Sequence, residues 1–226
     1  MEWVWENFSE IWGYVLDHIG LSVPPIIIGF VVSIPLGYWA SRSRVARSIL
    51  FSGFSILYTI PALVMFVLVP VALGLAILNP NNVIVALTIY ATAIMIRSAS
   101  DGFRAVSADV RDSARAVGYS AVQRFFRIEL PLAGPVLLAG IRVVSVSTVS
   151  LVTIGGFIGI SSLGNLIQTG YFEGFFPEIW TGIVATMVIA AVFDVILNGL
   201  GRLLLPWNRR LQRRRASRAV RAELVA

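Results

Sequence analysis

The sequence predicts an all-α integral membrane protein with about five transmembrane helices. Hydrophobic residues make up 57% of the 226 residues, charged residues make up only 13%, and the mean hydropathy is +0.83. A soluble domain of this size does not need so large an apolar fraction for its core. Several apolar blocks also approach or exceed the roughly 20 residues that a helix needs to cross a bilayer.

Five apolar blocks are the predicted spans. They cover about residues 19–40, 50–76, 82–98, 132–157 and 179–201. The third block is the weakest, because its uninterrupted apolar core runs only from Val83 to Ile96. Residues 1–18 combine three tryptophans with four acids, which predicts an extracytoplasmic amphipathic segment at the level of the lipid headgroups.

The arginines predict an orientation for these spans. All 18 basic residues are arginine: three follow the first span, six separate the third and fourth, eight follow the fifth, and Arg142 remains. Basic residues gather on the cytoplasmic side, so we expect these three regions inside and the N-terminus outside. The outer side then carries acids and no arginine, namely Glu2, Glu6, Glu10, Asp17, Glu173 and Glu178. An outside N-terminus and an inside C-terminus require an odd number of spans, and five satisfies this.

Composition limits the chemistry of the chain. The arginine-rich cytoplasmic tail, residues 202–226, directly follows a span, so we expect it to contact anionic lipids rather than nucleic acid. The chain has no cysteine, and its single histidine, His18, has no evident co-ligands, so we expect no metal site. It also has no lysine, and a P-loop requires one to reach the nucleotide phosphates. We therefore expect neither ATP hydrolysis by this chain nor a cofactor bound to it.

A polar segment between the third and fourth spans carries the most specific pattern. Its defining residues are Asp112, Ser113, Ala114, Gly118, Ile128, Leu130 and Pro131. Helical periodicity on both sides of Gly118 predicts a helix–glycine–helix element, because glycine permits a sharp turn. Pro131 suits the first turn of the fourth span. The alternative interpretation is an ordinary polar loop between two membrane helices.

This spacing resembles the cytoplasmic coupling loop of ABC importer permeases. The family pattern is Glu-Ala-Ala, three residues, Gly, nine residues, Ile, one residue and Leu-Pro; here Asp112, Ser113 and Ala114 replace Glu-Ala-Ala. Segments 58–63, 140–142 and 155–164 are similar to permeases for glycine betaine, carnitine, choline and proline. The likeness extends from about residue 20 to residue 200.

The resemblance implies the function of a type I importer. Residues 19–201 would form an ABC type-1 transmembrane domain in the bacterial inner or plasma membrane. The implied partners are a second permease subunit, identical or related, two cytoplasmic ATPases that carry ATP and Mg²⁺, and an extracytoplasmic solute-binding protein. The alternatives are a permease for an amino acid such as methionine, and a channel or structural membrane subunit outside the ABC class. A membrane enzyme is disfavoured, because the chain lacks a clustered nucleophile, base or metal set.

The second and third predicted spans contain a candidate substrate pathway. Pro61 lies inside the second span, where proline removes a backbone hydrogen bond and can open or kink a helix. Tyr58 and Thr59 lie beside it, and Tyr90 and Thr92 bring polar groups into the third span. Aromatic faces suit a quaternary ammonium solute through cation–π contacts. The alternative is that these aromatic side chains only pack between helices.

Two charges lie deep within the fourth and fifth spans. Arg142 follows Pro131 by eleven residues and Asp194 precedes Pro206 by twelve, which places them about 16 Å and 18 Å from the same membrane face. Isolated charges at such depth are costly and normally find a partner. We hypothesise that Arg142 and Asp194 form an ion pair that holds the two spans together.

Overall fold

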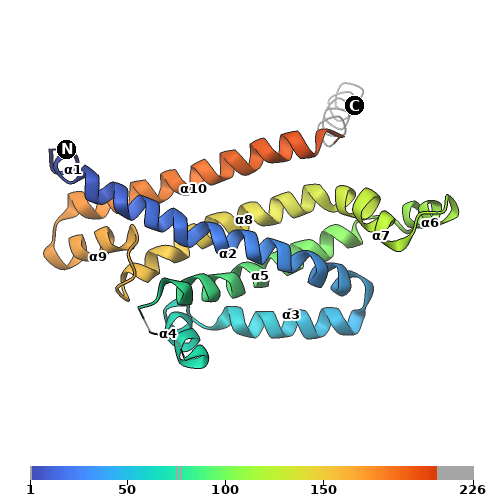
Figure 1. Cartoon of the computed structure of the whole chain (residues 1–226), viewed down its shortest axis with the longest axis horizontal. Helices are drawn as coiled ribbons and strands as arrows, with labels where there is room; N and C mark the ends of the chain where they lie inside the picture. The colour runs from blue at the N-terminus through green and yellow to red at the C-terminus, as the bar shows by residue number, and fades with distance from the viewer. Residues whose placement is uncertain (1, 75, 77, 208–226) are drawn as a thin grey trace, which may run out of the picture.

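The computed structural model describes residues 2–74, 76 and 78–207, and every regular element in this part of the chain is helical. The helices are α1 (Glu2–Glu6), α2 (Phe8–Arg42), α3 (Arg44–Thr59), α4 (Ala62–Leu73), α5 (Pro80–Arg104), α6 (Ala108–Ala116), α7 (Ala121–Arg124), the π-helix η1 (Phe125–Glu129), α8 (Leu130–Gly156), α9 (Gly164–Glu173) and α10 (Phe176–Leu204). The long helices run along the long axis of the molecule (Figure 1). The predicted all-α membrane fold is confirmed.

Four segments are long and apolar enough to cross a membrane, and the bent pair α3 and α4 makes up to five. The first span is part of the 35-residue helix α2, which continues directly from residues 8–18 and holds three prolines without a break. The predicted second span is divided. The chain bends by 106° between its helices α3 and α4, and the break lies at Ile60 and Pro61.

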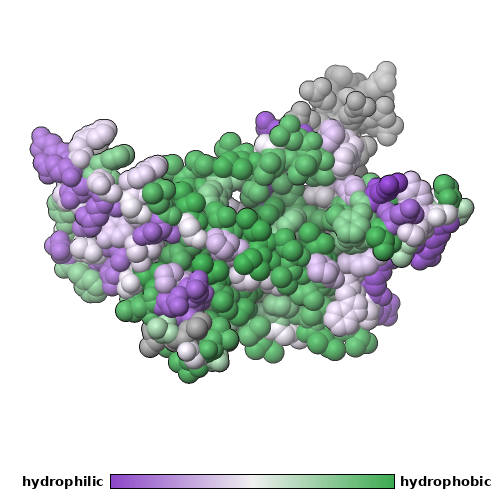
Figure 2. All heavy atoms as spheres, viewed as in Figure 1, coloured by the Kyte–Doolittle hydropathy of each residue, from purple (hydrophilic) through white to green (hydrophobic). Residues whose placement is uncertain are grey.

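Apolar and polar side chains are separated along the molecule. Figure 2 shows a broad hydrophobic zone over the middle, with hydrophilic residues at the two ends of the long axis. Trp5, Phe8 and Trp12 lie near the N-terminal end, are largely exposed and stack in sequence at 6.4 Å and 6.3 Å between ring centroids. Such aromatic side chains settle at the headgroup level of a bilayer.

Helix α5 is the most buried of the spanning helices, and α2 packs closely against it. The contact uses small residues on α2, including Ser33 and Gly37, both of which are buried. A Cβ atom at Gly37 would lie only 2.4 Å from Cβ of Ala99. Small residues let membrane helices approach closely. The predicted span with the shortest apolar core is therefore the central helix, and its polar residues Thr92 and Ser100 are buried within the protein.

Candidate functional site

The residues between α5 and α8 form a projecting element, here called the coupling segment (residues 107–131). Helices α6 and α7 are its outermost part and extend beyond the other labelled helices at that end of the molecule (Figure 1). Ser107 caps α6 by accepting a hydrogen bond from the Val110 amide. Ser120 and Gln123 form a reciprocal capping box on α7. Side-chain caps of this kind satisfy amides that a short helix leaves unpaired.

Gly118 makes the turn between α6 and α7. Its φ is +91°, a conformation that residues with a Cβ rarely adopt. The following amide, from Tyr119, donates to the Ala114 carbonyl at 3.1 Å and closes the end of α6. The helix–glycine–helix element expected from the sequence is present at this position.

The other pattern residues occupy different environments. Ala114 is buried, whereas Asp112 and Ser113 are exposed, and Asp112 pairs with Arg115 at 3.0 Å. Ile128, Leu130 and Pro131 are partly buried where the segment enters α8. Four large apolar side chains are exposed on the segment: Val110 (39%), Val117 (78%), Val122 (67%) and Phe126 (61%). The segment thus exposes several apolar side chains at an otherwise hydrophilic end of the molecule (Figure 2).

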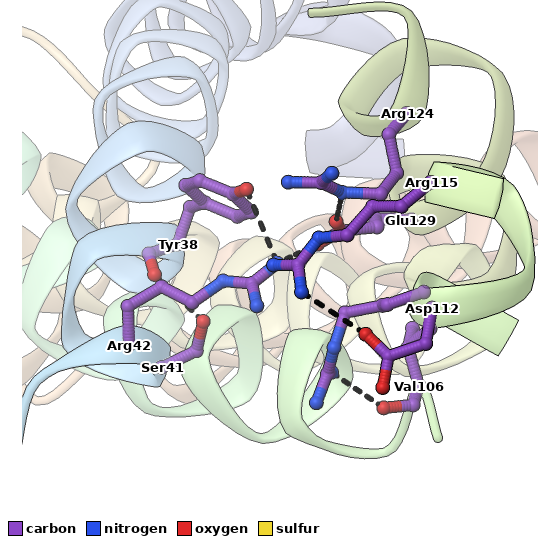
Figure 3. A network of polar contacts seen from close by, with 9 residues as sticks. Tyr38, Ser41, Arg42, Val106, Asp112, Arg115, Arg124 and Glu129 are labelled. Carbon is purple, nitrogen blue, oxygen red and sulfur yellow. Dashed lines mark hydrogen bonds and ion pairs between the residues drawn. The ribbon is translucent and has the colours of Figure 1, made fainter. Parts of the chain in front are cut away.

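The root of the coupling segment is held by a buried carboxylate that the sequence pattern did not single out. Glu129 has no solvent exposure and forms ion pairs with Arg42, at the end of α2, and with Arg124, on α7, the latter at 2.9 Å. Figure 3 shows the carboxylate joined to both guanidinium groups. Glu129 ends the π-helix η1, in which the Leu130 amide donates to the Phe125 carbonyl. The sequence does contain a signal for this contact, because Glu129 is a charged residue between the apolar residues Ile128 and Leu130 at the start of a predicted span.

An aromatic cluster supports the same root. Tyr38 makes edge contacts with Phe103 and Phe125, at 5.2 Å and 4.9 Å between ring centroids, and these two rings stack at 5.7 Å. The Arg42 guanidinium lies 4.9 Å from the Tyr38 ring centroid. The cluster and the ion pairs together join α2, α5 and η1, so the coupling segment is fixed to two spans at its base.

The residues predicted for a substrate pathway gather at the break between α3 and α4, with one exception. Tyr58 and Tyr90 meet edge to face at 5.6 Å, and the Tyr90 hydroxyl donates to the Ile60 carbonyl that precedes Pro61. Tyr58 and Thr59 line a cavity of about 360 Å³ with Arg97, whose guanidinium donates to the Ser55 hydroxyl. The carbonyl at the break is therefore satisfied by protein, as membrane depth requires.

Thr92 lies apart from this group. It is 3% exposed, its hydroxyl donates to the Thr88 carbonyl at 2.7 Å, and its own carbonyl accepts from Ser33 on α2 at 3.4 Å. The helical period turns Thr92 toward α2 rather than toward Tyr58. Thr92 thus lies in the contact between α5 and α2.

Arg142 and Asp194 lie together between α8 and α10. Arg142 donates through Nε to Oδ1 at 2.6 Å and through Nη2 to Oδ2 at 2.9 Å, and Asn198 adds a hydrogen bond of 3.1 Å to Oδ2. The two side chains are 39% and 30% exposed and line a cavity of about 500 Å³ with Ser147. A bidentate arginine–carboxylate pair is among the stronger charged contacts.

No metal site is visible in the described part of the chain, where no group of three or more histidine, aspartate or glutamate side chains could hold an ion.

Comparisons with known proteins agree with this architecture. The family of binding-protein-dependent transport system inner membrane components matches residues 29–210. The chain is 31% identical to a glycine betaine/carnitine/choline transport system permease protein of Bacillus subtilis (strain 168), covering 88% of each protein. It is 30% identical to a choline transport system permease protein of the same organism, covering 88% of this chain and 91% of the relative.

A solved structure shares the fold. The inward-facing MetNI methionine ABC transporter superposes with a TM-score of 0.73 at 20% identity, covering 86% of this chain and 95% of the matched chain. At this identity the likeness shows the fold alone. The family match covers most of the sequence, and the relatives share almost the whole length. The chain therefore belongs to the binding-protein-dependent transport system inner membrane components, as a multi-pass ABC permease subunit.

Proposed function

We propose that this chain is the permease subunit of an ATP-driven importer for small compatible solutes of the glycine betaine, choline, carnitine or proline type. The observation that carries the proposal is the coupling segment, whose two capped helices meet at Gly118 and expose Val117, Val122 and Phe126. Exposed apolar side chains on a projecting, capped helical element suit docking to a partner protein. The relatives named for betaine, carnitine and choline support the solute class.

The proposed assembly contains a second permease subunit, two cytoplasmic ATPases that bind ATP and Mg²⁺, and an extracytoplasmic solute-binding protein. The ATPases would dock on the coupling segment, and its movement would reach the spans through the Glu129 contacts with Arg42 and Arg124. In the proposed cycle the loaded binding protein docks outside, ATP closes the ATPases, and the permease pair rocks between two orientations. This sequence of steps rests on family membership.

An amino-acid importer is the second candidate, because the methionine transporter shares the fold. The greater identity to permeases named for betaine, carnitine and choline favours compatible solutes. Family membership also favours a transporter subunit over a channel or a purely structural subunit.

Uptake in cells with this gene deleted and restored tests the proposed solute class. Labelled glycine betaine, choline, carnitine, proline and methionine are supplied separately, with and without cellular ATP. We expect ATP-dependent uptake of a quaternary ammonium solute to return with the gene. Restored uptake of methionine alone would contradict the solute class and favour the second candidate.

A pair of matched substitutions tests the proposed docking of the ATPases. Val117→Asp places a charge on the exposed surface of the coupling segment, and Phe172→Asp makes a similar change on α9, where Phe172 is 74% exposed. We expect Val117→Asp to abolish copurification of the ATPase and Phe172→Asp to retain it. Equal copurification with both variants would show that the ATPase docks elsewhere.

A further inference from the structure

An open cleft of about 710 Å³ lies at the turn between α2 and α3. The end of α2, the first turns of α3 and the end of α5 line it. Its walls carry four arginines, Arg42, Arg44, Arg47 and Arg104, together with serine hydroxyls and the Phe51 ring. This turn lies toward the same end of the molecule as α6 and α7 (Figure 1).

The positive charge of the cleft is only partly compensated. Arg42 is bound by the buried Glu129, and Arg47 contacts Asp101 at 3.3 Å in a pair whose carboxylate is 60% exposed. Exposed pairs of this kind contribute little. Within the described residues, Arg44 and Arg104 have no carboxylate at salt-bridge distance. Both arginines line the cleft, and they come from different helices, α3 and α5.

The chemistry of the cleft suits a phosphate ester. Guanidinium groups bind phosphate oxygens through two parallel hydrogen bonds. The first turn of α3 adds the positive end of a 16-residue helix dipole, and the hydroxyls of Ser48 and Ser52 lie on the same wall. Phe51 adds an apolar surface to the cleft, and its ring centroid lies 5.1 Å from the Arg47 guanidinium carbon. The cleft therefore combines a cationic rim with an apolar wall.

The position of the cleft indicates the source of the phosphate. Exposed apolar side chains lie beside its lining residues: Trp39 (57%), Val45 (68%) and Ile49 (65%). Side chains of this kind face acyl chains in a membrane, and tryptophan marks the headgroup level. Residues with such neighbours are expected at the polar surface of the bilayer, beside the lipid headgroups.

We propose that the cleft binds the headgroup phosphate of an anionic phospholipid, such as phosphatidylglycerol, between Arg44 and Arg104. Basic pockets between membrane helices recognise anionic headgroups in this way. Arg104 is the last residue of α5 and lies three residues before Ser107, where the coupling segment begins. The bound lipid would therefore bridge α3 to the root of the coupling segment, independently of which solute is transported.

Lipid binding to the full chain, purified in detergent, tests this site. Native mass spectrometry counts bound phosphatidylglycerol in the parent, in the double variant Arg44→Gln/Arg104→Gln and in Arg202→Gln. Arg202 is an exposed arginine in the last turn of α10, so its substitution controls for loss of charge at the same end. We expect the double variant to bind about 30-fold more weakly, with the parent and the Arg202→Gln variant alike.

Three results would overturn the proposal. Equal retention of phosphatidylglycerol by the double variant would show that the cleft is not the site. An equal loss in Arg202→Gln would show that the lipid responds to total charge. Displacement of the lipid by millimolar inorganic phosphate or glycerol 3-phosphate would assign the cleft to a soluble anion. Circular dichroism of each variant shows whether its helices are intact, and a parallel measurement with phosphatidylcholine establishes the charge requirement.

Discussion

Glu129 brings a carboxylate with no solvent exposure to the point where η1 passes into α8, between guanidinium groups from α2 and α7. The aromatic rings of Tyr38, Phe103 and Phe125 pack against one another, and the Tyr38 ring lies against the Arg42 guanidinium. A buried charge that loses its partner strongly destabilises the folded state. The stability of this region therefore depends on the Glu129 contacts with Arg42 and Arg124. Arg142 and Asp194 form a second ion pair between helices, with both side chains partly exposed in the single chain.

The variant Glu129→Gln tests whether the buried ion pairs contribute more to stability than an exposed pair does. The neutral amide leaves Arg42 and Arg124 without their carboxylate, and we expect a loss of about 3–5 kcal/mol in unfolding free energy. Thermal unfolding of the purified chain measures it. The matched variant Asp112→Asn breaks an exposed pair with Arg115, for which we expect less than about 1 kcal/mol. Similar losses in both variants would contradict a special role for Glu129.

Removal of the charge at Asp194 tests the membrane pair. The Asp194→Asn variant leaves Arg142 with an amide at membrane depth, so we expect lower yield of folded protein and a lower Tm. The exchanged variant Arg142→Asp/Asp194→Arg restores opposite charges and should recover part of the loss. If Asp194→Asn matches the parent in folding and in solute uptake, the pair has no importance for either.

At the scale of elements, close packing of α2 on α5 contrasts with the break between α3 and α4. The close packing requires a residue without a side chain at Gly37. The break lies at Pro61, which has no amide hydrogen to continue the helix. Tyr90 links the two features, because it extends from the buried helix α5 and donates its hydroxyl hydrogen to the Ile60 carbonyl. The central helix thus stabilises the bent one.

A leucine at Gly37 should disrupt this packing. Its Cβ alone would lie 2.4 Å from Ala99 Cβ and 2.9 Å from the Ser100 amide nitrogen. Overpacking typically costs about 1–3 kcal/mol, and here backbone must move, so we expect at least this loss in thermal unfolding. A Cβ atom at Gly53 on α3 would meet nothing within 4 Å, so Gly53→Leu serves as the control with little expected change. Equal Tm values for the two variants would refute the packing argument.

At the scale of the whole molecule, hydrophilic residues lie at the two ends of an apolar middle (Figure 2). Because the chain has no cysteine, single cysteines report orientation directly. We expect Ser113→Cys to react with a membrane-impermeant maleimide only after the cytoplasmic side is opened, and Glu173→Cys to react in intact cells. Both positions are exposed. The reverse pattern would overturn the predicted orientation.

Sequence reasoning succeeded where one local property decides the structure. Pro61 indicated a possible break because it removes a backbone hydrogen bond, although α2 continues through three prolines; Gly118 indicated the turn because it lacks a Cβ. Arg142 and Asp194 could be paired by counting helical rise from the same face. Glu129 could not be predicted in the same way, since Arg42 lies 87 positions earlier. Thr92 was predicted to line the pathway because it is polar. Polarity alone does not show which face of the helix a residue occupies, and in the structure Thr92 lies on the face toward α2.

The length of α2 has a mechanical consequence. At 1.5 Å per residue its 35 residues extend about 52 Å, whereas the hydrocarbon core of a bilayer is about 30 Å thick. A helix longer than the hydrocarbon accommodates the difference by tilting or by extending into the headgroups. Arg42 at its end is bound to Glu129, so a change in the tilt of α2 also displaces the root of the coupling segment. A change in bilayer thickness is therefore expected to shift the coupling segment, which is the element that the proposed ATPases would move.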